Sequence, residues 1–437
     1  MRVAYLTAGA GGMYCGSCLR DNTLASALLR DGRDVVLIPV YSPIRTDDID
    51  VSQKRVFYGG INVYLQQRFG LFRHTPRLID RLLDHPALLR RAMSLGSGTS
   101  PSVLGAMTVS ILQGPTGAQR KELLRLIDGL ASLNAQLVHL PNALFVGLAG
   151  PIKEALRVPV VCTLTGEDIF IEKLCQPFQS DVLELIRRAG AHVDAFLSVS
   201  RHYTAYAVEH FGIAAERIHQ VPLGIHVEAA SDDPSLEPKA AAKDDRPFTI
   251  GYLARICPDK GLHVLCDAFE ELHRRRRPCR LLAAGYVGHG DRGYLRRLEQ
   301  RMAQQGLSGF CGFQGEVDRA GKFAMLRSID VLSVTTVYRE AKGLYVLEAL
   351  SQGVAVVQPR HGSFPELIEA TGGGVLFEPH DAVALADAIE RLMDDPALRR
   401  SLGSAGRRAV RTAFTDQIMA QRVWEVFEGL SGKMDPR

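Results

Sequence analysis

YREAKGLYVLEAL, from Tyr338 to Leu350, places Glu340 and Glu348 on either side of Gly343, a residue suited to opening a helix. A helix that begins near Gly343 leaves Glu340 in the preceding loop and Glu348 within its first two turns, so both carboxylates can face one crevice. Backbone N–H groups at a helix start have no partner inside the helix and attract a diphosphate. Nearby carboxylates can accept hydrogen bonds from sugar hydroxyls, so this stretch favours a sugar nucleotide as ligand.

The sequence on either side of this stretch alternates between strand and helix patterns. The apolar run IDVLSV at 329–334 precedes it, and another apolar run at 354–358 follows the predicted helix. Ligands of open parallel sheets bind at the carboxyl ends of strands, which is where this order places Glu340. The alternative interpretation is a loop carboxylate beside a helix start and a solvated helical glutamate, which are both common.

TIGYLARICPDKG, from Thr249 to Gly261, is a second signal and reads as a short strand followed by a loop. A helix is predicted after it, because apolar residues then recur at helical spacing. These positions are Leu262, Leu265, Ala268 and Phe269. Arg255 and Lys260 therefore fall in the connecting loop, where two cations can neutralise a diphosphate and stabilise it as a leaving group. The alternative interpretation is ordinary solvation of two loop cations.

Four segments follow one another in the order GYLARICPDKG, CGFQGEV, EAKGLYVLE and GVAVVQPRHGSFPE. In this order they resemble the carboxyl-terminal half of glycosyltransferase family 4, from about Thr249 to the end of the chain, with a looser match before it. The resemblance implies a GT-B fold, an α/β architecture in which two Rossmann-like domains face a central cleft and the last helix returns to the first domain. It also implies a retaining sugar transfer that requires no metal or other cofactor.

The same resemblance implies a role for several residues of this half. Arg255 and Lys260 would bind the donor diphosphate, Glu340 would contact the donor sugar, and Glu348 would hold the ribose hydroxyls. Phe313 would lie beside the nucleobase. Main-chain donors to the phosphates would come from Gly343, Leu344 and Tyr345.

The first half departs from the family in the segment that follows a predicted central strand. Members of the family often carry a histidine there, facing the reacting sugar, whereas this chain has Thr165. A threonine hydroxyl can hydrogen bond a sugar, but it takes no charge near neutral pH. Glu167 and Asp168 follow closely, and they are the carboxylates that would compensate on the acceptor side.

A glycine-rich turn follows the first predicted strand. Gly9, Gly11 and Gly12 resemble a dinucleotide fingerprint, but its third glycine would fall at Tyr14, and the second predicted strand ends without an acidic residue. An NAD enzyme is therefore not expected. We expect Gly11 and Gly12 to let the donor phosphate or the acceptor approach the backbone closely, as the resemblance also implies.

Cys15 and Cys18 form a C-x-x-C where this turn enters the first helix, and a helix amino terminus can lower a thiol pKa. A redox or metal role is one interpretation. No second C-x-x-C or histidine pair has zinc spacing, so a tight structural turn is preferred. Asp48 and Asp50 mimic a D-x-D metal motif, but they lie in a polar loop of the first half and are interpreted as solvated.

Length and composition predict two domains. A chain of 437 residues is too long for one ordinary core, and a formal charge of +4 favours neither nucleic acid nor a strongly acidic partner. With no leader and no apolar run of membrane length, a cytoplasmic protein is expected, and association with the inner membrane face is the less favoured addition. The predicted boundaries are an acceptor-binding domain at 1–227 with an irregular insertion at about 58–120, a linker at 228–246, a nucleotide-sugar-binding domain at 247–412 and a returning helix at 413–437.

These patterns predict a hexosyltransferase that takes its sugar from a nucleoside diphosphate, with UDP, GDP and ADP not distinguished. The acceptor would be a hydroxyl of a carbohydrate, a lipid-linked molecule or another small molecule. A phosphorylase or sugar-nucleotide epimerase of the same fold is the nearest alternative. The alternatives from other classes are a sugar-nucleotide-binding regulator without catalysis and a thiol-dependent redox or metal protein.

Overall fold

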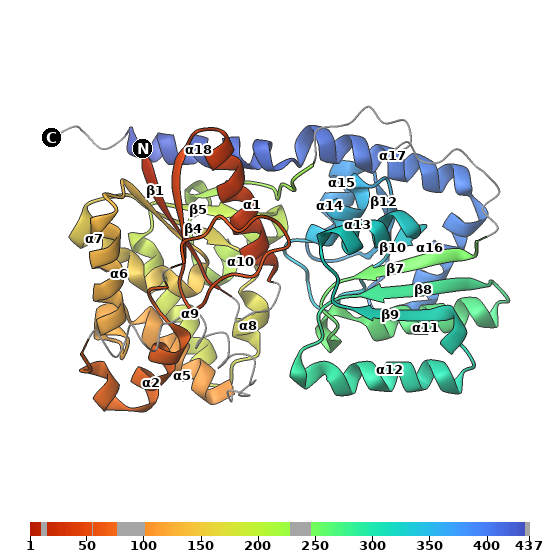
Figure 1. Cartoon of the computed structure of the whole chain (residues 1–437), viewed down its shortest axis with the longest axis horizontal. Coiled ribbons are helices and arrows are strands. Elements are labelled where there is room, and N and C mark those ends of the chain that lie inside the picture. The colour runs from red at the N-terminus through yellow and green to blue at the C-terminus, as the bar shows by residue number, and fades with distance from the viewer. Residues whose placement is uncertain (10–14, 55, 77–100, 228–245, 433–437) are drawn as a thin grey trace. The chain divides into compact units, whose positions relative to one another are not determined.

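A computed structural model describes residues 1–9, 15–54, 56–76, 101–227 and 246–432 (Figure 1). The chain divides into two compact units, unit 1 from Met1–Gly224 with Asp416–Arg437 and unit 2 from Ile225–Thr415. Gly11 and Gly12, the centre of the predicted insertion and all of the predicted linker except Arg246 lie outside the described residues.

Unit 1 contains a parallel sheet in the order β2-β1-β3-β4-β5-β6. Its strands are β1 (Arg2–Thr7), β2 (Asp34–Pro39), β3 (Leu137–Leu140), β4 (Val160–Leu164), β5 (Ala195–Ser198) and β6 (Ile218–Gln220). Every residue of β3, β4 and β5 is buried, as expected for parallel strands that helices cover on both faces. The strand order reverses between β1 and β3, so the loops after these two strands are the expected ligand-binding region of this unit.

The helices of unit 1 include one from the far end of the sequence. They are α1 (Gly16–Arg30), α2 (Gly60–Arg68), α5 (Pro101–Leu112), α6 (Arg120–Ser132), α7 (Ala149–Leu156), α8 (Asp168–Glu172), α9 (Phe178–Ala189), α10 (Arg201–Phe211) and α18 (Asp416–Ser431). Helix α18 lies alongside α1 (Figure 1), where Val423 and Phe427 join Leu24 and Leu28 in one buried apolar cluster. The last helix therefore packs on the first unit.

Unit 2 contains a second parallel sheet, in the order β12-β11-β10-β7-β8-β9. Its strands are β7 (Phe248–Leu253), β8 (Cys279–Ala284), β9 (Cys311–Gly315), β10 (Val331–Leu332), β11 (Ala355–Pro359) and β12 (Gly374–Phe377). Its helices are α11 (Leu262–Arg274), α12 (Arg292–Gln304), α13 (Arg319–Ser328), α14 (Leu344–Ser351), α15 (Phe364–Thr371), α16 (Ala382–Asp394) and α17 (Pro396–Ala413). The two sheets confirm the prediction of an α/β fold with two Rossmann-like domains.

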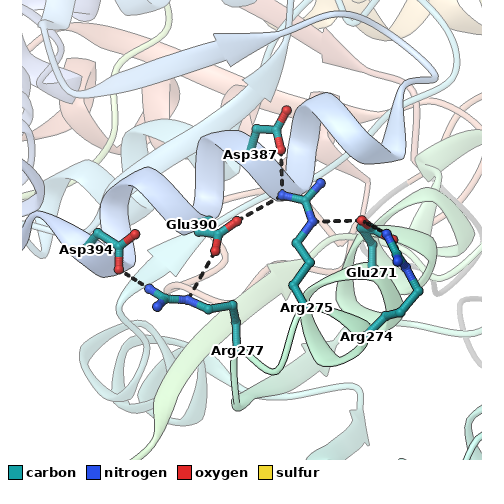
Figure 2. Close-up of polar contacts among 7 residues, drawn as sticks. All are labelled: Glu271, Arg274, Arg275, Arg277, Asp387, Glu390 and Asp394. Atoms are coloured by element: carbon teal, nitrogen blue, oxygen red, sulfur yellow. Dashed lines mark hydrogen bonds and ion pairs between the residues drawn. The ribbon is translucent and has the colours of Figure 1, made fainter.

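The basic run at the end of α11 is neutralised by acidic residues (Figure 2). The Arg275 guanidinium contacts Glu271 at 2.7 Å, Asp387 at 2.6 Å and Glu390 at 2.9 Å, so it links α11 to α16. Arg277 pairs with Glu390 and Asp394 of the same helix. The cations therefore hold two helices of unit 2 together.

Replacing Glu390 with glutamine should destabilise unit 2 only slightly. Partly exposed ion pairs contribute up to about 1 kcal/mol, which corresponds to roughly 2–4 °C in the thermal midpoint of a domain of this size. The loss should shrink in high salt, because salt screens exposed charges. Calorimetry of Glu390→Gln beside Glu299→Gln, which changes an exposed glutamate of α12, measures the effect. A much larger loss would show that the network is a main determinant of the fold.

Candidate functional site

The predicted donor-site residues of unit 2 gather where its strand order reverses. The order changes direction between β7 and β10, and ligands of doubly wound sheets bind at the carboxyl ends of the strands at such a point. The loop after β7 carries Arg255 and Lys260, and the loop after β10 carries Glu340. Arg255 is exposed, whereas Glu340 is buried and Lys260 is mostly so. Residues distant in sequence therefore meet at one edge of the sheet.

Lys260 and Glu340 form a close ion pair enclosed by two tyrosines. The Lys260 Nζ lies 2.5 Å from Glu340 Oε2. The hydroxyls of Tyr338 and Tyr345 donate to the same carboxylate oxygen at 3.0 and 3.2 Å. The ammonium also lies 5.0 and 5.4 Å from the centres of these two rings, within the range of a cation–π interaction. Four side chains from two loops and the start of α14 thus form one preorganised cluster.

The cluster keeps Glu340 ionised. Burial opposes ionisation, but the charge and hydrogen bond of Lys260, with the positive charge of Lys342, outweigh it and lower the pKa of Glu340 to about 2. The other oxygen, Oε1, accepts a hydrogen bond from the Lys342 backbone N–H at 3.3 Å. Glu340 is therefore an acceptor of hydrogen bonds at neutral pH and has no proton to donate.

Two glycines allow the close backbone approaches that build this cluster. Gly261 has φ +70°, and a Cβ there would lie 1.7 Å from the carbonyl oxygen of Thr335. The Thr335 hydroxyl in turn donates to the Gly261 carbonyl at 2.6 Å, which ties the β7 loop to the β10 loop. Gly362, with φ +59°, would place a Cβ 2.5 Å from the Glu340 nitrogen. A larger residue at Gly362 would displace the backbone of Glu340, and one at Gly261 would separate the two loops.

Helix α14 begins where the sequence predicted. Gly343 is its N-cap in the left-handed region, with φ 68°, and the helix runs from Leu344 through Glu348 to Ser351. The first helical residues, Leu344 and Tyr345, are thus at the helix start, where backbone N–H groups attract an anion. Glu340 lies in the preceding loop, as expected.

Glu348 has a partner that the sequence did not reveal. The Lys322 ammonium of α13 lies 2.6 Å from Glu348 Oε1, and both side chains are nearly buried. Glu348 Oε2 accepts no hydrogen bond from the part of the chain that the structure describes, so one carboxylate oxygen remains available for a ligand. Phe313, the predicted nucleobase neighbour, lies partly exposed on the edge strand β9.

The acceptor-side candidates of unit 1 follow β4 and differ from one another in environment. Thr165 is buried. The Glu167 carboxylate accepts hydrogen bonds from the backbone N–H groups of Thr165, Gly166 and Ala143 at 3.0–3.1 Å and from the Tyr203 hydroxyl at 2.7 Å. Both of its oxygens are therefore occupied in holding the loop, which is the local role that the geometry supports.

Asp168 is the carboxyl of this loop with a free oxygen. It is buried, and its Oδ1 has no hydrogen-bond partner. Burial and the neighbouring negative charge of Glu167 raise the pKa of Asp168 to about 6. Asp168 can therefore exchange a proton near neutral pH.

The structure shows what surrounds the D-x-D motif, and its described residues also bear on metal-holding groups and membrane-spanning helices. Asp48 and Asp50 accept hydrogen bonds from their own loop, from the N–H groups of Ile49 and Ser52. Within the described ranges, no group of three or more His, Cys, Asp or Glu side chains is placed to hold a metal ion. None of the helices in those ranges is both long and apolar enough to cross a membrane.

Two family models match adjoining parts of the chain. The model described as Glycosyltransferase Family 4 matches residues 111–229, and the model described as Glycosyl transferases group 1 matches residues 235–409. The second match contains Arg255, Lys260, Glu340 and Glu348, so the site of unit 2 lies entirely within it.

The relatives of the chain include mycobacterial mannosyltransferases. Phosphatidyl-myo-inositol mannosyltransferase of Mycobacterium tuberculosis H37Rv is 31% identical over 221 residues, which cover 49% of this chain and 54% of that protein. The GDP-mannose-dependent alpha-(1-6)-phosphatidylinositol monomannoside mannosyltransferase of Mycolicibacterium smegmatis is 27% identical over 340 residues, which cover 76% of this chain and 84% of that protein. The chain spans about half the length of the phosphatidyl-myo-inositol mannosyltransferases that it matches.

Solved structures share the whole architecture. Sucrose-phosphate synthase from Thermosynechococcus elongatus has a TM-score of 0.70 at 17% identity and covers 99% of this chain and 100% of that one. The Anabaena protein HepE in complex with UDP has a TM-score of 0.66 at 17% identity and covers 98% and 100%. At such identities the likeness concerns the fold, which is GT-B, as the sequence predicted.

Proposed function

The chain belongs to glycosyltransferase family 4, and from this premise we propose that it transfers a sugar from a nucleoside diphosphate sugar to an acceptor hydroxyl. The observation that carries the proposal is the Lys260–Glu340 pair at the reversal of strand order in unit 2. This pair supports the proposal because an ammonium can bind a diphosphate and an ionised carboxylate can bind a sugar, and Glu340 lies in the loop before α14.

Leaving-group stabilisation is the main chemical task of unit 2 in this proposal. As the bond between the sugar and the diphosphate breaks, negative charge grows on the phosphate oxygens. Lys260, Arg255 and the N–H groups at the start of α14 stabilise that charge. Lys260 has three N–H donors, so it can keep its contact with Glu340 and still donate to a phosphate.

The two glutamates hold the ends of the donor. Glu340 accepts hydrogen bonds from hydroxyls of the transferred sugar, and the free oxygen of Glu348 accepts from the ribose. A phosphate oxygen of the donor takes the acceptor proton on the face that the diphosphate leaves, which gives retention of configuration. Binding of the acceptor by unit 1, near Thr165 and Asp168, is part of the same proposal.

The names of the relatives suggest the first donor and acceptor to test. Two of the related proteins are named for mannose transfer to phosphatidylinositol or its mannoside, one of them with GDP-mannose. We therefore propose GDP-mannose as the first donor and an inositol lipid as the first acceptor. Such an acceptor places the protein at a membrane surface, as a peripheral protein on the cytoplasmic side.

Thermal stabilisation by nucleotides tests the donor site. A ligand at about 100 times its Kd adds about 2.7 kcal/mol to the stability of the folded state. One of UDP, GDP and ADP should therefore raise the thermal midpoint of unit 2 selectively. Glu348→Ala should lower the affinity for that nucleotide at least about tenfold, since a hydrogen bond to a charged group contributes about 1.5–3 kcal/mol. Glu299→Ala, an exposed change on α12, is the matched control. No shift with any nucleotide would contradict the proposal.

Metal removal should leave the reaction unchanged. Lys260, Arg255 and the start of α14 already provide positive potential for the diphosphate, so we propose that no divalent ion is required. Initial rates with EDTA and with Mg²⁺ should agree within about twofold, well under the roughly hundredfold loss expected when a main charge stabiliser is missing. Loss of turnover in EDTA with full recovery on adding Mg²⁺ would refute this part.

A further inference from the structure

The two cysteines of the C-x-x-C lie in the first turn of α1. Cys15 is the N-cap of the helix and Cys18 is its third residue. The Leu19 N–H donates to the Cys15 carbonyl at 2.9 Å, so this turn is regular. Residues three apart in a helical turn have Cα atoms roughly 5 Å apart. That separation lies within the range of about 4.4–6.8 Å found for disulfides, so a bond between them needs little backbone movement.

The two thiols differ in accessibility. Cys15 is partly exposed, whereas Cys18 is fully buried, and neither is in a disulfide. A hydrogen bond with the Cys15 side chain, together with burial, raises the pKa of Cys18 well above its usual value. An accessible thiol three residues before a buried one is the arrangement of an attacking cysteine and its resolving partner.

The pair also lies at a position where the fold places ligands. Helix α1 follows β1, and the strand order of unit 1 reverses between β1 and β3. A backbone hydrogen bond from Gly9, two residues beyond β1, reaches the Cys18 thiol. The thiols are therefore at the ligand-binding edge of the first sheet.

We propose that Cys15 and Cys18 form a reversible dithiol–disulfide site that reacts with small or protein disulfides. The Cys15 thiolate attacks one sulfur of an external disulfide and releases one thiol, which leaves a mixed disulfide on Cys15. Cys18 then gives up its proton and attacks the Cys15 sulfur, which releases the second thiol. Two cysteine thiols are thereby oxidised and one external disulfide is reduced to two thiols. A dithiol reductant reverses both steps.

Metal binding is the competing use of two adjacent thiolates. Structural zinc is almost always held by four protein ligands. In the described part of the chain, no third or fourth cysteine, histidine or carboxylate joins this pair in a metal-holding group. The geometry therefore favours thiol exchange, and it does so independently of sugar transfer.

Equilibration of the reduced, full-length protein with glutathione buffers tests this site. After acid quenching, alkylation and peptide mass spectrometry, the expected product is a peptide in which Cys15 and Cys18 together have lost two hydrogens. Closure within one turn has a high effective concentration. We therefore compare the glutathione disulfide concentrations at which half of the pair is oxidised and half of the exposed Cys175 is glutathionylated. The concentration for the pair should be at least about tenfold lower.

Single variants in a Cys175→Ser background separate a redox role from packing. Cys18→Ser should trap a glutathione mixed disulfide on Cys15, because the resolving thiol is absent. Cys15→Ser should trap almost none, because Cys18 is buried. Circular dichroism shows whether each variant is folded, and Cys18→Ala replaces Cys18→Ser if the hydroxyl is not tolerated. Equal glutathionylation of the two variants, a wild-type pair that stays reduced while Cys175 is modified, or stoichiometric zinc in the purified protein would overturn the proposal.

Discussion

Replacing Lys260 with methionine should slow sugar transfer by about a hundredfold to a thousandfold, the loss expected when one stabiliser of transition-state charge is removed. The same change leaves Glu340 buried and ionised without its counter-charge, which should cost about 3–5 kcal/mol of stability. A single variant therefore confuses a catalytic defect with a folding defect. Steady-state rates and thermal midpoints must be measured on the same samples.

The double variant Lys260→Met with Glu340→Gln separates the two effects. It removes both charges of the buried pair, so most of the lost stability should return, while transfer should stay at least about a hundredfold below wild type. Lys173→Met, at an exposed lysine after α8, controls for the loss of a positive charge elsewhere. A stable double variant with wild-type turnover would show that the pair is structural only.

Acid unfolding of unit 2 tests the Lys260–Glu340 ion pair in a second way. The surrounding cations, Lys260 above all, outweigh the effect of burial and lower the pKa of Glu340 to about 2, below its ordinary value of 4.5. A carboxyl with a lowered folded-state pKa stabilises the protein above its unfolded value, and this contribution is lost as the pH falls from about 4.5 towards 2. Glu340→Gln should lack this part of the acid transition.

Replacing Asp168 with asparagine should stabilise unit 1 at neutral pH. Burial and Glu167 raise the pKa of Asp168 from 3.8 to about 6, so the folded state binds the proton more tightly than the unfolded state does. Stability therefore falls as the pH rises from about 4 to 6, by up to about 3 kcal/mol for a shift of this size. Above pH 6, Asp168→Asn should recover that loss, which corresponds to roughly 6–12 °C in the thermal midpoint.

The pH dependence distinguishes this effect from better packing. Below about pH 4, Asp168 is protonated in both states, so the gain of the asparagine variant should vanish there. Glu172→Gln, at an exposed glutamate on the same helix, should show little gain at either pH. A gain of equal size at pH 4 and pH 7.5 would contradict a buried charge. If the asparagine variant is more stable but transfers sugar more slowly, the buried Asp168 carboxyl takes part in the reaction on the acceptor side.

Short segments with strong local signals were predictable from the sequence. Gly343 marks the start of α14 because a left-handed N-cap requires a residue without a side chain, and the apolar spacing after Gly261 indicates α11. The meeting of Lys260 with Glu340 also follows from the order of strands, since the loops after β7 and β10 adjoin at the reversal. The alternating pattern thus predicted the fold and the loops that carry these residues, whereas their direct ion pair was not predicted.

The contacts that depend on how separate elements pack were not predictable. Nothing in the spacing of α13 and α14 indicates that Lys322 reaches Glu348, because that contact depends on the rotation of two helices about their axes. Strand β10 spans only Val331–Leu332, although the apolar run is longer, and the Thr335 hydroxyl beyond it donates to the Gly261 carbonyl of the β7 loop. Hydrophobicity alone does not show where pairing stops.

Transfer of labelled sugar is the most direct test of the proposed function. Wild-type protein and the folded Lys260→Met with Glu340→Gln variant are incubated with labelled GDP-mannose, UDP-glucose or ADP-glucose. Phosphatidylinositol vesicles and a set of saccharides serve as acceptors, and products are separated by chromatography. We predict label in an acceptor with the wild type and at least about a hundredfold less with the variant. Selective nucleotide binding by the wild type with no label in any acceptor and no release of the sugar would instead identify a regulator without catalysis.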